Sequence, residues 1–400
     1  MTRLFLNGLA ASAGGGLTYL RNVIPHLSRR GDAEATVLVS SAIRNEFGEQ
    51  PNISFVSLLE SSTTALRFVR EQATVPELIR RSGAQVLISA GNFALWRSPI
   101  PQILLSRNSL YTSSDFLHDV RARGDYALWA DTVVKGWLAR RSIGRAEITV
   151  APSEAFAQQL SQWSGRKVFS VHHGFDADSF TRDATPLPAE VQEQLEQHQD
   201  ALRLLFVSHY NYYRNFETLF RAIPILRGRL RAKKVKLFLT CRLNSAENPG
   251  TYRADSAATL ASELRGSHDI IELGSIPYRS LHRLYRACHI YVTPAYSESF
   301  AHPLIESMSS ALPVVASDLP VHQEICGDAA IYFPRFSADA LADRILQIQE
   351  SPDRSAALSR NGLQRARDFS WSEHVERLLV LAEECRRYAS KGADAHWKRD

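Results

Sequence analysis

The chain has 400 residues, a hydrophobic content of 44%, a charged content of 22% and a formal net charge of +5 at pH 7. This length exceeds what one hydrophobic core usually serves and predicts two domains, and the composition is that of an ordinary soluble globular protein. No dense basic run with interleaved aromatic residues is present, which argues against a nucleic-acid partner, and no apolar run reaches the ~18–20 residues that a membrane span needs.

In the first half of the chain, short apolar runs alternate with helical patterns, which is typical of parallel sheets covered by helices. The predicted strands cover residues 4–7, 35–39, 53–56, 85–89, 102–106 and 148–151. The predicted helices include residues 16–29, 65–81 and 126–145. Residues 187–200 are rich in Gln, Glu and Pro, and we interpret them as a surface segment that follows the domain junction.

The second half repeats the alternation and predicts a second Rossmann-like unit. Its predicted strands cover residues 202–208, 236–241, 270–273, 290–293, 313–316 and 330–333. Its predicted helices cover residues 216–231, 256–265, 280–286, 303–309 and 338–348, and a last helical stretch runs from near Trp371 towards Tyr388. Ligands of such units are expected at the carboxyl ends of the parallel strands.

The four cysteines have no metal-ligand spacing, so we expect buried free thiols in a reducing compartment. They are Cys241, Cys288, Cys326 and Cys385. The start Met1-Thr2-Arg3 leads directly into a strand-like segment rather than into a signal peptide. A cytoplasmic location is therefore the expectation.

The most informative segment is residues 297–306, with the sequence SESFAHPLIE. Its carboxylates, Glu298 and Glu306, are separated by seven residues, and Pro303 stands where a helix would begin. Free backbone N–H groups at the start of that helix suit a diphosphate, and the two carboxylates suit sugar and ribose hydroxyls. The segment indicates a site for a nucleotide-activated sugar.

Together with the short strand at 312–317, this segment makes residues 291–333 resemble the donor-binding signature of the retaining glycosyltransferases of family 4, which have the GT-B fold. The resemblance covers almost the whole chain. It implies an α/β architecture of two Rossmann-like domains that face each other across a cleft. Residues 1–175 would form the acceptor domain, residues 176–370 the donor domain, and residues 371–400 a helix that crosses back to the first domain.

The same resemblance assigns roles in the donor site. Glu298 would hold hydroxyls of the donor sugar, and Glu306 would hold the ribose. The loop of Phe300, Ala301 and His302 would face the diphosphate. These residues are the centre of the predicted donor-binding set.

The family places an Arg just after the first strand of the donor domain and a Lys five residues later. Here Ser208 ends the predicted strand, His209 takes the Arg position and Arg214 the Lys position. Arg214 keeps a permanent charge and can bind phosphate, whereas His209 is a weaker, pH-dependent substitute. Solvated surface charges are the alternative for both. The turn that contains Ser275 and Ile276 resembles a loop whose backbone meets the base, so the base itself stays open.

In the first domain, Gly15 and Gly16 lie in a glycine run between a strand and a helix, where backbone N–H groups can approach a ligand closely. A flexible loop without a ligand is the alternative. Arg107 and Asn108 follow the strand at 102–106, where many relatives have a His-Asp or His-Asn pair near the reacting sugar. Arg107 cannot act as a base at neutral pH, although it can bind an anionic acceptor or a phosphate.

Three further patterns carry weaker hypotheses. His118-Asp119 is interpreted as a surface pair, and Asp176-Ala177-Asp178 is not assigned as a metal site because it falls at the domain junction. Residues 129–145 mix Trp and Leu with Lys and Arg, which fits either a core helix with a charged outer face or a helix that contacts a membrane surface.

We therefore expect a retaining glycosyltransferase that needs neither a metal nor a cofactor and moves a hexosyl group from a nucleoside diphosphate sugar to a hydroxyl acceptor. The acceptor would be a saccharide or a lipid-linked saccharide in envelope polysaccharide or glycolipid synthesis. Its predicted catalytic set is Glu298, Arg214, Arg107 and Asn108. A nucleotide-sugar-binding scaffold without turnover, and an epimerase or phosphorylase of the same fold, stay open as alternatives.

Overall fold

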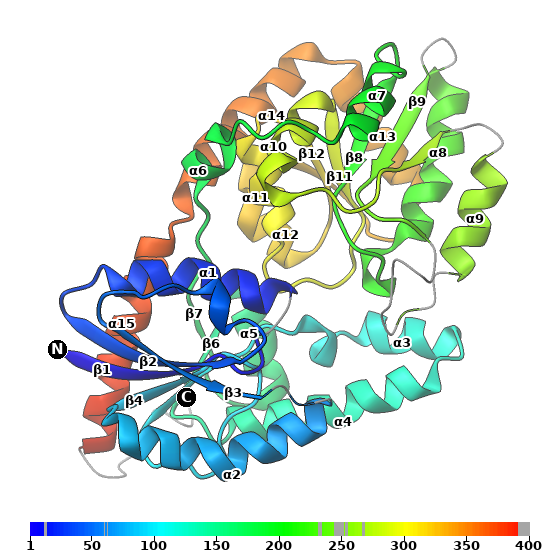
Figure 1. Cartoon of the computed structure of the whole chain (residues 1–400). Helices are drawn as coiled ribbons and strands as arrows, with labels where there is room; N and C mark the ends of the chain where they lie inside the picture. Colours follow the sequence, from blue (N-terminus) through cyan, green and yellow to red (C-terminus); the bar gives the residue numbers. More distant parts are fainter. Residues whose placement is uncertain are drawn as a thin grey trace. The chain divides into compact units, whose positions relative to one another are not determined.

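The computed structural model describes residues 1–11, 14–59, 61, 63–230, 234–243, 252, 255–265 and 269–390. The chain divides into two compact units (Figure 1). The first consists of Met1–Thr112, Ala130–Gly174 and Ser370–Asp400, and the second of Ser113–Trp129 and Phe175–Phe369. Each unit has its own parallel sheet, which confirms the predicted α/β architecture of two Rossmann-like domains.

The first unit contains a seven-stranded parallel sheet in the order β3-β2-β1-β4-β5-β6-β7. Its strands are β1 (Thr2–Asn7), β2 (Ala33–Ser40), β3 (Ile53–Leu58), β4 (Val86–Ser89), β5 (Gln102–Leu105), β6 (Ile148–Ala151) and β7 (Phe169–Ser170). Every residue of β4, β5 and β6 is buried, as expected for strands covered by helices on both faces. The six predicted strands are confirmed, whereas β7 was not predicted, because two residues are too few to show a pattern.

Helices pack on this sheet from several parts of the chain. They are α1 (Gly14–Ser28), α2 (Thr64–Ser82), α4 (Tyr126–Ile143), α5 (Glu154–Ser164) and α15 (Trp371–Ser390), and α4 begins in the residues assigned to the second unit. Short 3-10 helices are η1 (Arg44–Glu46) and η2 (Ser109–Thr112). The helices at 16–29, 65–81 and 126–145 were predicted within two residues at each end, whereas α5 was not predicted.

The C-terminal helix belongs to the first unit, as predicted. Trp371, Val375, Leu378 and Ala382 of α15 lie in one core cluster with residues of β1, β2 and α1. The chain enters this helix past Gly174, where a Cβ atom would lie 2.0 Å from the backbone nitrogen of Trp371. Only glycine permits this approach of the two backbones. The start of the C-terminal helix therefore requires a glycine at position 174, just before the domain junction.

The second unit contains a six-stranded parallel sheet in the order β10-β9-β8-β11-β12-β13. Its strands are β8 (Leu202–Phe206), β9 (Val235–Leu239), β10 (Ile270–Glu272), β11 (Ile290–Thr293), β12 (Val314–Ser317) and β13 (Ala330–Phe333). All six were predicted, and the bounds of β11 and β13 agree at both ends.

The helices of the second unit include several that the sequence pattern did not predict. The full set is α3 (Ser114–Ala122), α6 (Ala177–Arg182), α7 (Ala189–Glu196), α8 (Phe216–Leu230), α9 (Asp255–Arg265), α10 (Tyr278–Ala287), α11 (His302–Ser309), α12 (Pro320–Cys326), α13 (Ala338–Gln349) and α14 (Pro352–Arg365), with 3-10 helices η3 (Tyr212–Arg214), η4 (Gly327–Ala329) and η5 (Ala366–Asp368). The supposed surface segment at 187–200 contains α7, which buries Val191 and Leu195. Two apolar residues on one face are enough to hold a helix of this length against the unit.

Residues Ser113–Trp129 belong to the second unit, although the predicted division placed them in the first domain. Asp115 of α3 forms an ion pair with Arg335 after β13, at 3.0 Å between Oδ2 and Nε. Asp119 accepts a hydrogen bond of 2.6 Å from the hydroxyl of Tyr296, which follows β11.

Among the described residues, no helix combines the length and the apolar content that a membrane crossing requires.

Candidate functional site

The order of the second sheet identifies the position where a ligand is expected. From β8 the chain proceeds to β9 on one side, whereas β11, the other neighbour of β8, is followed by β12 on the opposite side. The chain therefore leaves the neighbouring strands β8 and β11 in opposite directions along the sheet, and this position is called a switch point. Ligands of open parallel sheets bind at the carboxyl ends of the two strands there. The loops after β8 and β11 contain Arg214 and Glu298.

Arg214 and Glu298 form an ion pair between Nη1 and Oε1, and their side chains are 19% and 10% exposed. Sequence reasoning predicted both residues as ligand contacts but not that they contact each other. The Nε atom of Arg214 is buried and has no hydrogen-bond partner in the described part of the chain. The Arg214 guanidinium is therefore held in place and keeps one N–H group, at Nε, available for a hydrogen bond. It lies beside the Glu298 carboxylate, where the sequence predicted the nucleotide-sugar site.

The loops that carry this pair are tied together by polar contacts. Asn215 adopts the left-handed conformation with φ +56°, and its side-chain amide donates to the carbonyls of Pro294 at 3.1 Å and Arg335 at 2.7 Å. The backbone N–H of Tyr296 donates to the carbonyl of Tyr213 at 2.9 Å. These bonds join the ends of β8, β11 and β13, so the position of Arg214 relative to Glu298 is set by backbone as well as by charge.

Helix α11 begins four residues after Glu298, and its N-cap residue is strained and supplies no side-chain cap. Ala301 occupies the N-cap position with φ +67° and ψ +67°, and its side chain supplies no cap hydrogen bond. A residue other than glycine in this left-handed conformation costs about 1–3 kcal/mol, and such strain concentrates at functional sites. The Ala301 side chain therefore accepts no hydrogen bond from the N-terminal N–H groups of α11, and a helix start without a side-chain cap suits an anion.

Phe300 and His302 flank this strained residue. Phe300 is buried, and its ring lies 4.9 Å from the His302 ring and 5.8 Å from the Phe369 ring, measured between centroids. Phe300 therefore holds the loop through core packing, whereas the sequence assigned it to the set of residues that face the donor.

Glu306 lies inside α11, with 6% of the residue exposed. The Tyr285 hydroxyl donates to its Oε2 atom at 2.9 Å. Burial raises the pKa of Glu306 from 4.5 to about 7, against a lowering effect of the Tyr285 hydrogen bond. Glu298 thus pairs with an arginine, whereas Glu306 accepts a hydrogen bond from a phenol, so the two predicted carboxylates have different partners.

Other predicted donor contacts lie at the carboxyl ends of β8 and β10. His209 is exposed, and its side chain forms no hydrogen bond or ion pair with Arg214 or Glu298 in the described structure. The Ser208 N–H donates to the Thr240 hydroxyl at 3.0 Å. Ser275 is exposed and Ile276 partly so, in the turn after Gly274, which has φ +77°.

Helix α3 adds a polar network that the sequence did not reveal. Arg123 pairs with Asp119 and with Glu217, at 2.9 Å in each case, and its guanidinium lies 4.4 Å from the centre of the Tyr212 ring. Burial alone would lower the pKa of Arg123, but the two carboxylates outweigh it and raise that pKa. His118 is exposed as predicted, whereas Asp119 is a partly buried member of this network. Asp119 lies four residues before Arg123, whereas Glu217 and Tyr212 are far from both in sequence, and no local pattern marks them as partners.

In the first unit, Arg107 and Asn108 follow β5 as predicted. Both backbone N–H groups donate to the Asn92 side-chain oxygen, at 2.6 Å and 3.1 Å. The Arg107 guanidinium donates to the Ala90 carbonyl and lies 4.7 Å from the centre of the Tyr19 ring. Burial lowers the pKa of Arg107, and no carboxylate in the described part of the chain forms an ion pair with it. The first unit thus holds an uncompensated cation at the carboxyl edge of its sheet.

Tyr19 and His374 extend this cluster without adding charge. The His374 Nδ1 atom lies 2.8 Å from the His172 carbonyl, which can only accept, so Nδ1 carries the hydrogen. The Tyr19 hydroxyl, 3.0 Å from Nε2, is then the donor to that nitrogen. Burial lowers the pKa of His374 to about 4, so the ring stays neutral near pH 7. The positive charge of the cluster therefore rests on Arg107 alone.

The two predicted glycines lie in the first turn of α1 rather than in a loop. A Cβ atom at Gly16 would lie 2.8 Å from the Ala11 Cα, whereas a Cβ at Gly15 would meet no atom within 4 Å. A side chain at position 16 would therefore clash with Ala11, whereas position 15 has room for a side chain. Residues 12–13 of the predicted glycine-rich loop lie outside the described residues.

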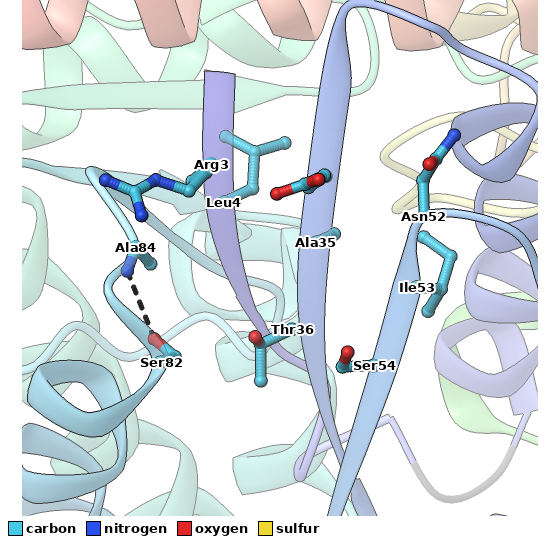
Figure 2. A pocket seen from close by; sticks show the side chains of 10 residues that line it. Arg3, Leu4, Ala35, Thr36, Asn52, Ile53, Ser54, Ser82 and Ala84 are labelled. Carbon is cyan, nitrogen blue, oxygen red and sulfur yellow. Dashed lines mark hydrogen bonds between the residues drawn. The ribbon is translucent and has the colours of Figure 1, made fainter. Parts of the chain in front are cut away.

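Two other features prove to be separate from the predicted site. A cavity of about 310 Å³ lies at the amino ends of β1, β2 and β3, away from the carboxyl ends that carry Arg107, and Figure 2 shows Arg3, Thr36 and Ser54 among its lining residues. Asp176 caps α6 by accepting from the Ser179 N–H at 2.9 Å, and Asp178 pairs with Arg182. The Asp-x-Asp pattern is thus explained by helix capping.

The four cysteines are buried free thiols, as the sequence predicted. Burial raises the pKa of each thiol to about 12, so none is a thiolate at neutral pH.

Comparisons with known proteins agree with this arrangement. A stretch of 100 residues, 25% of this chain, is 38% identical to the O-antigen chain mannosyltransferase B of Escherichia coli and covers 26% of that protein. A stretch of 207 residues, 50% of the chain, is 30% identical to the D-inositol 3-phosphate glycosyltransferase of Thermobispora bispora and covers 47% of it. The chain therefore aligns with about half of the length of these relatives, or less.

Among solved structures, the chain is similar to the Anabaena protein Alr3699/HepE in complex with UDP-glucose. The TM-score is 0.70 at 15% sequence identity, and the match covers 96% of this chain and 100% of that chain. At this identity the likeness establishes the fold.

The model of the family "Glycosyltransferase Family 4" matches residues 13–179, and the model of "Glycosyl transferases group 1" matches residues 189–365. The first match covers β2 to β7 and the second β8 to β13, so the second match contains the loops after β8 and β11. The chain belongs to the family 4, group 1 glycosyltransferases, which have the GT-B fold.

Proposed function

We propose that this chain is a retaining, metal-independent glycosyltransferase that moves a hexosyl group from a nucleoside diphosphate sugar to a hydroxyl acceptor. The observation that carries the proposal is the Arg214–Glu298 pair beside the uncapped start of α11, at the switch point of the second sheet. The UDP-glucose bound to the Anabaena protein supports a nucleotide-sugar donor.

The proposed mechanism follows from where charge develops. As the glycosidic bond breaks, negative charge builds on the departing diphosphate. The Arg214 guanidinium and the N–H groups of α11 are fixed before the reaction and would stabilise this charge, which is commonly the largest contribution to catalysis. Glu298 would hold sugar hydroxyls and, through its ion pair, the orientation of Arg214.

A diphosphate oxygen would accept the proton of the incoming hydroxyl on the face that the leaving group vacates. Attack on that face retains the configuration of the sugar and needs no protein nucleophile. Because a guanidinium supplies the positive charge next to the diphosphate, the scheme works without a divalent cation. The exposed His209 and the turn at Ser275 and Ile276 would contribute the outer contacts to the nucleotide.

For the acceptor we propose a saccharide or lipid-linked saccharide of envelope polysaccharide or glycolipid synthesis, an assignment supported by the name of the Escherichia coli relative. Arg107 and Asn108 stand after β5 of the first unit, and Arg107 lacks a counter-charge among the described residues. Arg107 would therefore bind an anionic group of the acceptor. Faster transfer to a neutral sugar than to its phosphorylated form would contradict this role.

The proposed activity is tested by measuring nucleoside diphosphate release from a panel of nucleotide sugars, with and without sugar acceptors, in buffer that contains EDTA. We expect release that depends on the acceptor and continues in EDTA, and a product with the anomeric configuration of the donor. Release without any acceptor would indicate a hydrolase, and binding without release would indicate a scaffold. Loss of activity in EDTA, with recovery on adding a divalent metal, would disprove metal independence.

Glu306→Ala is expected to weaken binding of the nucleoside diphosphate by about ten-fold in calorimetry, because a hydrogen bond to a charged group is worth about 1.5–3 kcal/mol. The carboxylate would accept the ribose hydroxyls through the oxygen that Tyr285 does not occupy. Tyr285→Phe is the companion variant and should leave most of the affinity. An unchanged affinity of Glu306→Ala would contradict the ribose role.

Glu306 should also make folding stability depend on pH. Between about 4.5 and 7 the carboxyl is protonated in the folded chain and ionised in the unfolded chain. The folded state then binds the extra proton, so its stability falls as pH rises, by up to about 1.4 kcal/mol per pH unit. Urea unfolding of wild type and Glu306→Gln at pH 5 and pH 7 should show the wild type losing about 2–3 kcal/mol relative to the variant. A constant difference between the two proteins would show that Glu306 titrates normally.

A further inference from the structure

The loop after β11, which carries Glu298, is held by side chains from both of its neighbours in the sheet. On one side, Asn215 of the loop after β8 donates to the Pro294 carbonyl. On the other side, the hydroxyl of Ser317, the last residue of β12, donates to the Ala295 carbonyl. Ala295 lies three residues before Glu298, so the bond from Ser317 acts on the backbone that leads to the predicted carboxylate.

The direction of the Ser317 hydroxyl is set by a histidine. A serine hydroxyl can rotate, and its single hydrogen goes to whichever neighbour can only accept. His322, the third residue of α12, has its Nδ1 atom 3.1 Å from the Ser317 carbonyl and 3.0 Å from the Ser317 Oγ. Because the carbonyl can only accept, Nδ1 carries a hydrogen, and Oγ is an acceptor on that side. The hydroxyl hydrogen of Ser317 is therefore left for the Ala295 carbonyl.

The other ring nitrogen of His322 is not used. The residue is completely buried, and burial, together with the nearby positive charge of Arg214, lowers its pKa to about 4. The ring is therefore neutral near pH 7, and Nε2 is a bare acceptor. This atom is buried and has no hydrogen-bond partner among the residues that the structure describes. A buried polar atom without a partner destabilises the folded chain, so packing alone does not explain a histidine at this position.

We propose that His322 is a positioning residue for Glu298 and that it acts through the hydroxyl of Ser317. The inference rests on the proposed function, in which Glu298 holds hydroxyls of the donor sugar. The two bonds, from His322 Nδ1–H to Ser317 Oγ and from that hydroxyl to the Ala295 carbonyl, are called the His322 relay. Its three residues are fully buried, so water does not compete for these bonds. Arg214 holds the end of the Glu298 side chain, and the relay holds the backbone from which that side chain starts.

Two substitutions of His322 separate the roles of its ring nitrogens. The side-chain amide nitrogen of asparagine takes the place of Nδ1, whereas that of glutamine takes the place of Nε2. His322→Asn therefore keeps a donor for Ser317, and His322→Gln loses it. Ser317→Ala removes the second bond of the relay. Because the two bonds act in series, Ser317→Ala combined with His322→Gln should be little worse than either change alone.

The first measurement is backbone hydrogen exchange of the full chain without ligand, followed by mass spectrometry on the peptide that contains Glu298. We expect about ten-fold faster exchange of this peptide in His322→Gln and Ser317→Ala, because local opening of the loop becomes easier. His322→Asn should exchange like the wild type. The matched control is His282→Gln on α10, since His282 is also buried and its Nδ1 likewise has no partner in the described structure. The control should leave the peptide unchanged.

The second measurement compares sugar transfer with nucleotide binding. With the donor that the nucleotide-sugar panel identifies, kcat/KM should fall about 5- to 20-fold in His322→Gln and Ser317→Ala, because a misplaced carboxylate loses its sugar contacts. His322→Asn should restore most of the rate. Calorimetric affinity for UDP, or for GDP where UDP does not bind, should stay within about two-fold of wild type, since the relay contacts neither Glu306 nor Arg214.

Thermal unfolding should show that all variants are folded, and Ser317→Ala decides the question where His322→Gln does not fold. Exchange of the Glu298 peptide at the wild-type rate in both variants would overturn the proposal. Activity kept in His322→Gln but lost in His322→Asn would also overturn it, because the role would then lie at Nε2. Equal losses of transfer and of nucleotide affinity would leave His322 a structural role only. A wild type that transfers no sugar would refute the proposed function, whereas the exchange rates would still decide whether the relay holds the loop.

Discussion

Arg214→Ala should lower kcat/KM by about 30- to 1,000-fold, equivalent to about 2–4 kcal/mol of transition-state stabilisation. The loss should fall mainly on kcat, because the charge on the diphosphate is larger in the transition state than in the bound donor. The substitution also leaves Glu298, whose side chain is 10% exposed, without its cation. Steady-state kinetics with saturating acceptor measures the effect.

Two further variants separate charge from geometry at this position. Arg214→Lys keeps the positive charge but not the planar fork that can hold Glu298 and a phosphate together, so it should fall between wild type and Arg214→Ala. Arg229→Ala is the matched control, because Arg229 pairs with Asp343 on an exposed part of the second unit. An Arg214→Ala enzyme with the turnover of Arg229→Ala would exclude Arg214 as a diphosphate contact.

Arg123→Met should lower the free energy of unfolding by about 2–3 kcal/mol. Removing one partner of a buried ion pair costs about 3–5 kcal/mol, and the value is smaller here because solvent reaches part of the network. The Asp119 and Glu217 side chains, 25% and 11% exposed, would be left as neighbouring carboxylates without their cation. Urea unfolding measures the loss, and methionine keeps the apolar stem of the side chain in place.

Activity should fall in Arg123→Met as well, since the network touches residues adjacent to the predicted site. Arg123 lies over Tyr212, two residues before Arg214, and its partner Asp119 holds Tyr296, two residues before Glu298. Arg123→Lys should restore most of kcat if positioning is the cause. The control Arg182→Met breaks an ion pair between side chains 77% and 79% exposed, and should change stability by less than about 0.5 kcal/mol. Full activity of Arg123→Met below its unfolding temperature would show that the network is only structural.

The sequence alone determined most of the secondary structure and the centre of the candidate site. Strands such as β11 and β12 are buried on both faces, so they appear as short apolar runs bounded by polar residues. The segment from Glu298 to Glu306 was visible because its two carboxylates, its helix start and its proline lie within ten consecutive residues. Short elements such as β7 and α6 leave too few residues for a period to emerge.

Only the tertiary structure decided which groups face each other. Arg214 and Glu298 are 84 residues apart, and their contact depends on the pairing of β8 with β11. In the same way, the partnership of Glu306 with Tyr285, the position of α3 in the second unit and the outward direction of Trp137 depend on packing between distant segments. A local pattern fixes how one segment buries its own apolar side chains. The partner that a charge meets is fixed by the fold of the whole unit, because the energy of that contact exists only once both segments are in place.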